Sequence, residues 1–284
     1  MLTDAFLARL DTLRLVMRGR AQGGAGGSRR SRQTGSSAEF SDYREYIPGD
    51  DIRRLDWNAL ARFDRLYMKL FMEEQESQVT ILLDASASME AKWGAARSAA
   101  ETVGYLALTG GDRLRLQLLK DGRAVCSPQF SGRAAFAKLT AFLDRAEPDG
   151  KEGTLTEAVL RAEGLKKGLC FLITDGYTED ALKEALDYLR YMRQETAVIQ
   201  VLSGGELRPE TEGAVRLRDS ESGEEIDLLA DRNALENYHQ ALEDFLKQVR
   251  ENCSGREAPY LLLDGSEVFE DCFLPLLARS GMIG

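Results

Sequence analysis

From residue 79 onward, short apolar runs alternate with segments of helical periodicity. Residues 79–83 read Val-Thr-Ile-Leu-Leu, comparable runs occupy 168–173, 197–202 and 260–263, and a further strand is expected at 112–119. Continuous apolar runs of this length are typical of strands buried on both faces of a parallel sheet. Helices are expected between the runs, at 92–109, 134–145, 154–163, 180–194, 235–249 and 269–278. The alternation predicts an α/β fold with a doubly wound, mostly parallel sheet of Rossmann type.

Shorter segments indicate antiparallel pairing. Residues 124–127 follow the turn sequence Lys120-Asp121-Gly122-Arg123, which predicts a hairpin with the preceding strand. A second hairpin is expected at 214–229, with its turn at 221–223. Residues 66–71 also resemble a strand. We expect this strand to pair with the 214–229 hairpin in a small β subdomain.

The first 37 residues differ from the rest of the chain. Apolar side chains recur there at helical spacing, at Leu2, Phe6, Leu10, Leu13 and Met17, and residues 19–37 are rich in Gly, Ser and Arg. This predicts an amphipathic helix followed by a flexible arm. The helix is expected to dock on its own domain or on a partner, with an anionic membrane surface as the alternative. Because a glycine-rich arm carries few contacts, residues 1–27 are expected to be dispensable for folding.

The predicted domains are therefore 1–37, a segment at 38–78, and the α/β domain at 79–284. The net charge is −10, although residues 1–37 carry seven arginines against two aspartates. An acidic body argues against nucleic acid as a partner. No apolar stretch reaches the roughly 20 residues of a membrane helix, and the start lacks a signal-peptide pattern, so a cytoplasmic location is expected. The four cysteines form no C-x-x-C pair, which favours reduced thiols over zinc or disulfides.

Candidate chemistry begins where the run 79–83 ends, at Asp84-Ala85-Ser86-Ala87-Ser88. Open α/β folds place ligands at the carboxyl edge of the sheet, where this loop is expected. One carboxylate and two hydroxyls on alternate residues can face one point, and hard oxygen donors suit Mg²⁺ or Mn²⁺. A threonine follows Gly153, and a second apolar strand ends at Asp175. The loops that carry Asp84, Thr154 and Asp175 are then expected to converge at one edge of the sheet. This convergence favours a metal site over the alternative that Asp84 and the serines only cap a helix.

This set resembles the metal-ion-dependent adhesion site of von Willebrand factor A domains. The resemblance implies a von Willebrand factor A-like fold and a Mg²⁺ site made of Asp84, Ser86, Ser88, Thr154 and Asp175. It also implies that the serines and the threonine bind the ion directly or nearly so, while the aspartates act mostly through water. Thr154 is preferred to Thr156 because it directly follows the glycine, as in the family pattern.

The residues ahead of this core resemble a second family signature. The stretch from Glu39 to Arg62, with Tyr46-Ile47-Pro48-Gly49-Asp50 and Leu55-Asp56-Trp57-Asn58 inside it, is similar to the bacterial domain-of-unknown-function family 58. Members are typically encoded beside a MoxR-type AAA+ ATPase. The resemblance implies a Mg²⁺-dependent protein-interaction module that binds a Glu or Asp of such an ATPase or of its client. It assigns no role to the segment from Tyr43 to Arg62.

Enzyme classes fit the sequence less well. A serine hydrolase needs a base oriented toward its nucleophile, but the single histidine, His239, lies on a late predicted helix and the sequence contains no G-x-S-x-G elbow. An aspartyl phosphotransferase needs an acid two residues after its nucleophile, where Ser86 stands, and the chain has no Walker A sequence. A metal-dependent phosphohydrolase stays open as the alternative function, because Mg²⁺ polarises phosphates. The expectation is a binding module rather than an enzyme.

Overall fold

The structure, a computed structural model, describes residues 2–16, 39–47, 55–63, 65–72, 78–209, 213–218 and 225–284. The chain divides into two compact units, one formed by residues 24–76 and the other by residues 1–23 with 77–284. The predicted arm at 19–37 and the predicted turn at 221–223 lie outside the described residues.

A seven-stranded sheet forms the centre of the larger unit, with the strand order β11-β8-β7-β3-β4-β5 and with β6 also paired to β4. Its strands are β3 (Gln78–Asp84), β4 (Arg113–Lys120), β5 (Arg123–Cys126), β6 (Phe130–Ser131), β7 (Gly168–Thr174), β8 (Gln194–Leu202) and β11 (Tyr260–Asp264). The pairs β11·β8, β8·β7, β7·β3 and β3·β4 are parallel, whereas β5 and β6 run antiparallel to β4. The predicted fold class, a doubly wound and mostly parallel α/β sheet, is confirmed.

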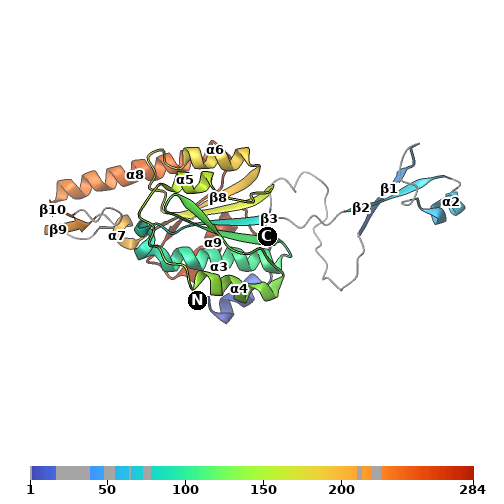
Figure 1. Ribbon diagram of the computed structural model, residues 1–284, viewed down its shortest axis with the longest axis horizontal. Coiled ribbons are helices and arrows are strands. Elements are labelled where there is room, and N and C mark those ends of the chain that lie inside the picture. The colour runs from blue at the N-terminus through green and yellow to red at the C-terminus, as the bar shows by residue number, and fades with distance from the viewer. Residues whose placement is uncertain are drawn as a thin grey trace. The chain divides into compact units, whose positions relative to one another are not determined.

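Helices cover both faces of this sheet (Figure 1). One face carries α1 (Asp4–Leu10), α3 (Trp93–Thr109), α4 (Phe136–Leu143) and α9 (Phe269–Arg279). The other carries α5 (Leu155–Leu160), α6 (Lys183–Tyr191) and the long α8 (Arg232–Ser254). Two 3-10 helices, Ala87–Lys92 and Arg133–Ala135, precede α3 and α4, and the short α7 (Gly204–Leu207) follows β8.

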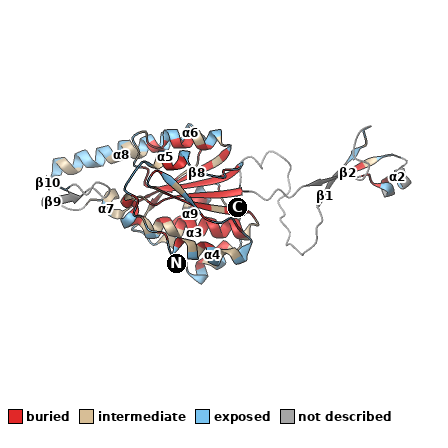
Figure 2. Cartoon of the chain, viewed as in Figure 1, coloured by how far each residue is buried: buried red, intermediate tan, exposed pale blue. Residues whose placement is uncertain are grey.

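The alternation of side chains along each strand divides the core into two clusters. Ile81 and Leu83 belong to the cluster under α3, whereas Leu82 between them belongs to the cluster under α6. All seven residues of β3 and all seven of β7 are buried, which explains their continuous apolar sequences. Figure 2 shows this burial along the central strands and exposure on the outer helix faces.

The order of the strands creates a switch point between β3 and β7. From β3 the chain moves to β4 on one side, and from β7 it moves to β8 and β11 on the other. At such a point the crossovers on the two sides lead away from each other and leave a crevice at the carboxyl ends of the strands. Leu83 pairs with Ile173 in register, so β3 and β7 end at the same edge.

The N-terminal helix is part of the core of the larger unit. Phe6 and Leu10 of α1 are buried with α3 and α9, and Leu15 forms a β-bridge with Ile283. Asp11 accepts a hydrogen bond from the Tyr105 hydroxyl at 2.6 Å. The amphipathic helix therefore docks on its own domain. The burial of Phe6 and Leu10 argues against the expectation that residues 1–27 are dispensable for folding, because their removal would expose core residues of α3 and α9.

In the smaller unit, β1 (Glu39–Glu45) and β2 (Tyr67–Met72) form an antiparallel pair, and α2 (Trp57–Phe63) lies between them in sequence. The predicted pairing of residues 66–71 with the 214–229 hairpin is wrong. β2 pairs with β1, while β9 (Gly213–Arg218) and β10 (Glu225–Ala230) form a separate two-stranded sheet. Periodicity identifies a strand but not its partner, because any neighbouring backbone can supply the hydrogen bonds.

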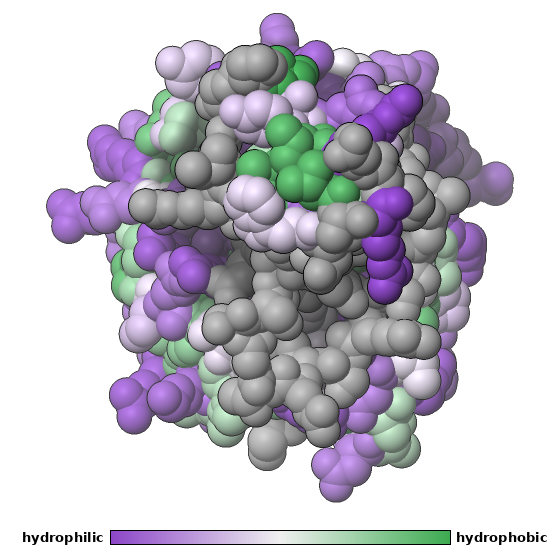
Figure 3. All heavy atoms as spheres, turned by 90° about the vertical axis from the view of Figure 1, so that its right-hand side faces the viewer, coloured by the Kyte–Doolittle hydropathy of each residue, from purple (hydrophilic) through white to green (hydrophobic). Residues whose placement is uncertain are grey.

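On the face that Figure 3 shows, hydrophilic residues predominate among the coloured atoms and a small hydrophobic patch lies near the centre. Charged residues make up 30% of the chain. Across the described ranges, no helix is both long enough and apolar enough to cross a bilayer.

We predict that Phe6→Ala destabilises the protein by about 3–5 kcal/mol, the usual range when a buried aromatic side chain is removed from a core. Phe6 is 1% exposed and contacts the ring of Phe269 edge to face. The measurement is chemical unfolding. Ala8→Ser on the exposed side of the same helix is the control and should change the free energy of unfolding by less than about 0.5 kcal/mol. Equal stability of Phe6→Ala and wild type would show that α1 is not a structural part of the domain.

Candidate functional site

A cleft of about 390 Å³ opens at the edge of the sheet where β3 and β7 end. All five predicted site residues line it: Asp84, Ser86, Ser88, Thr154 and Asp175. Asp84 is the last residue of β3, and Asp175 directly follows β7. Both aspartates are nearly fully buried, each with 3% of the residue exposed. The parallel pairing of two strands thus brings together two acids that lie far apart in sequence.

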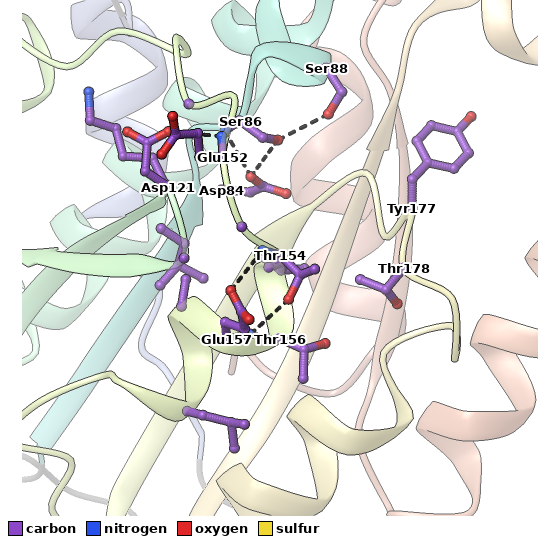
Figure 4. A pocket seen from close by; sticks show the side chains of 18 of the residues that line it. Asp84, Ser86, Ser88, Asp121, Glu152, Thr154, Thr156, Glu157, Tyr177 and Thr178 are labelled. Atoms are coloured by element: carbon purple, nitrogen blue, oxygen red, sulfur yellow. Dashed lines mark hydrogen bonds between the residues drawn. The ribbon is translucent and has the colours of Figure 1, made fainter. Parts of the chain in front are cut away.

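Four of the five side chains form one chain of hydrogen bonds, which Figure 4 shows in part. Ser86 donates to Asp84 Oδ1 from its backbone N–H at 3.0 Å and from its hydroxyl at 2.8 Å. The Ser86 and Ser88 hydroxyls lie 3.0 Å apart. Ser88 then donates to Asp175 Oδ2 at 2.7 Å. The alternate spacing of Asp84, Ser86 and Ser88 therefore places all three side chains on one side of the loop, as predicted.

Thr154 reaches the cleft from the opposite wall. It is the N-cap of α5, and its hydroxyl accepts a hydrogen bond from Glu157 N at 3.1 Å while the Glu157 carboxylate accepts from Thr154 N. Among the residues that the structure describes, no hydrogen bond links Thr154 to the other four site residues. Figure 4 shows Thr154 across the cleft from Ser88, and Thr156 lies two residues further on in α5.

The loop that carries Thr154 is held by contacts that the sequence did not reveal. Asp121, in the β4–β5 turn, accepts hydrogen bonds from Lys151 N at 2.9 Å and from Glu152 N at 3.1 Å. Gly150 forms a parallel bridge with Ser86 on the other side. Gly153 adopts φ +70°, and a Cβ there would lie 2.7 Å from Gly122 N, so only glycine fits. The sequence Lys120-Asp121-Gly122-Arg123 predicts a hairpin turn but gives no sign of this distant contact.

A buried lysine was also missed. Lys92, at the end of the first 3-10 helix, donates to Asp175 Oδ2 at 2.9 Å and to Glu206 Oε1 at 2.6 Å. Its side chain is 1% exposed, and its ammonium lies 5.1 Å from the centroid of the Tyr177 ring. Glu206 belongs to α7 and accepts hydrogen bonds from both the N–H and the hydroxyl of Ser203. The pattern Ser-x-x-Glu at 203–206 does signal a capped helix, but nothing in the sequence links it to Lys92.

The charges around the cleft are mostly negative. Eight carboxylates and two lysines line it. Burial raises the pKa of Asp84 to about 6, and the nearby charge of Asp175 acts in the same direction. Hydrogen bonds from Thr174 and Ser86 act against this rise. The cleft therefore attracts cations and repels anions.

The donor set suits a small hard cation. Two carboxylates and three hydroxyls supply only oxygen atoms, which is the ligand type that Mg²⁺ and Mn²⁺ prefer. Within the described residues, no group of three or more His, Cys, Asp or Glu side chains has the arrangement of a metal site. An ion here would therefore depend on the hydroxyls of Ser86, Ser88 and Thr154. The assignment of these five residues as metal ligands stays a prediction.

The fold and the site define a doubly wound α/β protein with acids and hydroxyls gathered at its switch point. Residues 42–247 match the family described as "Protein of unknown function DUF58", and the chain belongs to that family. This confirms the family prediction made from the stretch between Glu39 and Arg62.

Relatives are similar over most of their length. Uncharacterized proteins of Mycobacterium bovis (Mb1516) and Mycobacterium tuberculosis (Rv1480) are each 26% identical over 272 residues, which cover 90% of this chain and 84% of theirs.

Two solved structures are also similar. BatB from Bacteroides thetaiotaomicron has 19% identity and a TM-score of 0.46, and covers 72% of this chain and 98% of its own. An aerotolerance-related membrane protein from Bacteroides fragilis has 17% identity and a TM-score of 0.43, with 72% and 99% covered. At these TM-scores neither likeness bears on the function of this chain.

We predict that the site makes stability depend on pH. Because the pKa of Asp84 is higher in the folded chain than in the unfolded one, its contribution to the free energy of unfolding is complete below about pH 4 and is lost as the pH rises through about 6. In EDTA, wild type should lose stability relative to Asp84→Asn between about pH 4 and about pH 7, by roughly 2–3 kcal/mol. Chemical unfolding of both proteins across this range measures the difference. Parallel pH profiles would show that Asp84 titrates normally.

Proposed function

We propose that the chain is a Mg²⁺-dependent protein-interaction module with a von Willebrand factor A-like domain. The ion, held by Ser86, Ser88 and Thr154 and supported by Asp84 and Asp175, would supply a positive charge that binds a Glu or Asp of a partner. The observation that carries this proposal is the hydrogen-bonded chain from Asp84 through both serines to Asp175 at the switch point of the sheet.

The charge of the cleft supports an interaction that depends on the ion. Carboxylates outnumber lysines in its lining by eight to two, so a carboxylate of a partner would be repelled in the absence of a cation. The largely neutral hydroxyl donors leave much of the ion's charge uncompensated, which favours an anionic additional ligand. Weak metal binding is expected for the same reason, because few protein charges hold the ion.

The proposed partner is a MoxR-type AAA+ ATPase or a client that it presents. This part of the proposal rests on membership of the family and on the acidic ligand that the site chemistry calls for. Because such a partner uses ATP, the proposal places the interaction in the cytoplasm. Binding should require Mg²⁺ and should be lost when the acidic residue of the partner is changed to its amide.

We predict that wild type binds Mg²⁺ in calorimetry and that Ser86→Ala weakens this binding by about tenfold or more, because loss of even a group that only supports a metal ligand costs about that much. The melting temperature should stay near that of wild type, since the Ser86 hydroxyl is part-buried and, among the described residues, forms hydrogen bonds with the site residues Asp84 and Ser88. Ser98→Ala, on α3 away from the cleft, is the matched control. If Ser86→Ala binds Mg²⁺ as tightly as wild type does, the proposed metal site is wrong.

The same variant separates binding from catalysis. If Mg²⁺ supports turnover of a generic phosphoester and Ser86→Ala abolishes it, the protein is a metal-dependent phosphohydrolase instead. Association with the ATPase that survives both EDTA and Ser86→Ala would place the contact on another surface.

We predict that Thr154 contributes an oxygen to the ion in addition to capping α5. Thr154→Ser keeps both functions and should behave as wild type. Thr154→Ala should lower the free energy of unfolding by about 1 kcal/mol through loss of the cap and should also weaken Mg²⁺ binding. Thr156→Ala, two residues further on in the same cleft, should change neither. If Thr154→Ala loses stability but keeps its Mg²⁺ affinity, Thr154 is a helix cap only.

A further inference from the structure

Lys92 is an unusual residue in this part of the protein. Its side chain is 1% exposed, yet it lies beside a cleft that otherwise collects negative charge. An ammonium group removed from water needs close anionic partners to offset its lost hydration. Lys92 has two, Asp175 Oδ2 at 2.9 Å and Glu206 Oε1 at 2.6 Å, and the Tyr177 ring lies next to it.

These contacts connect the lysine to the candidate metal site through one carboxylate only. Asp175 Oδ2 is shared between the Lys92 ammonium and the Ser88 hydroxyl. Asp84, in contrast, has hydroxyl and N–H donors as its hydrogen-bond partners. One of the two site carboxylates is therefore neutralised by a fixed positive charge, and the other is not.

We propose that Lys92 sets the charge of the candidate metal site, so that a divalent cation binds there weakly and keeps the net positive charge that selects an anionic ligand. This inference rests on the proposed function and adds a residue that determines its selectivity. The positive charge of Lys92 repels the ion and so lowers the affinity of the site for it. The same charge attracts a carboxylate and so raises the affinity of the ion-loaded site for an anionic ligand. The two effects have opposite signs because both arise from one fixed charge.

The negative charge of Glu206 partly compensates the positive charge of Lys92. Its carboxylate lies 2.6 Å from the ammonium and its side chain is 26% exposed, so its charge is partly screened by water. Removing that charge while keeping the side-chain volume leaves the positive charge of Lys92 less compensated. Glu206→Gln should therefore shift the site in the direction opposite to Lys92→Met.

The experiment measures Mg²⁺ binding by calorimetry, and then the binding of acetate to the Mg²⁺-loaded protein at constant ionic strength. Lys92→Met should tighten Mg²⁺ binding by roughly tenfold, equal to about 1.4 kcal/mol, and should weaken acetate binding. Glu206→Gln should weaken Mg²⁺ binding by several fold and tighten acetate binding. A purely structural role predicts weaker binding of both ligands in both variants.

Lys120→Met is the matched control. Lys120 lines the same cleft and pairs with Asp149 at 2.6 Å, so its loss removes an equal charge from the rim without touching Asp175. It should change Mg²⁺ affinity less than Lys92→Met does. Melting temperatures identify a variant that fails to fold. If Lys92→Met does not fold, Glu206→Gln alone still decides the matter, since weaker acetate binding in it contradicts the inference.

The outcomes also distinguish this inference from the proposed function. If wild type binds Mg²⁺ and Ser86→Ala weakens the binding, but Lys92→Met leaves it unchanged or weaker, Lys92 is a structural residue and only this inference is wrong. If neither wild type nor any variant binds Mg²⁺, the proposed function is overturned and the inference with it. If Lys92→Met alone binds Mg²⁺, the inference holds, while the metal dependence proposed for the wild-type protein is wrong.

Discussion

The parallel pairing of β3 with β7 is the constraint on which the rest of the site depends. Both strands are buried along their whole length, so their register is fixed by side chains on two faces at once. A slip of one residue would turn the side chains of a strand to the opposite faces of the sheet, so that each would have to pack in the other core cluster. The register from Gln78↔Gly168 to Leu83↔Ile173 therefore determines where both strands end. Asp84 and Asp175 meet at that edge because this register brings the carboxyl ends of both strands there.

Two acids held together in this way repel each other, and the surrounding groups show how the fold tolerates them. Asp84 receives three hydrogen bonds, from Thr174 and from the backbone and side chain of Ser86. Asp175 receives bonds from Ser88, Tyr177 N and Lys92. Even so, burial leaves the pKa of Asp84 raised to about 6. Near neutral pH its ionised form therefore lowers stability, and a group kept at such a cost is better explained by binding than by folding.

Local pattern was enough to predict the sheet and much of the site. Continuous apolar runs identify buried strands, and an acid directly after such a run lies at a strand end, which is how Asp84 and Asp175 were found. Thr154 required the family resemblance, because a threonine after a glycine is common. The contact between Lys92 and Glu206 could not be predicted, since 114 residues separate them and neither is unusual in its own segment. The pairing of β2 with β1 was missed for a related reason: a sequence pattern encodes which face is buried but not which element covers it.

The arrangement of charges also explains why this kind of site suits conditional recognition. A surface of exposed arginines would bind a carboxylate at all times, because its charge is permanent. Here the permanent charge of the cleft lining is negative, and its hydroxyl donors are neutral. A partner carboxylate would gain favourable interaction only after a divalent ion is bound, and the buried Lys92 would then add to that attraction rather than create it. In the proposed function the exchangeable ion would supply the positive charge needed for recognition, and the fixed ammonium group of Lys92 would strengthen it.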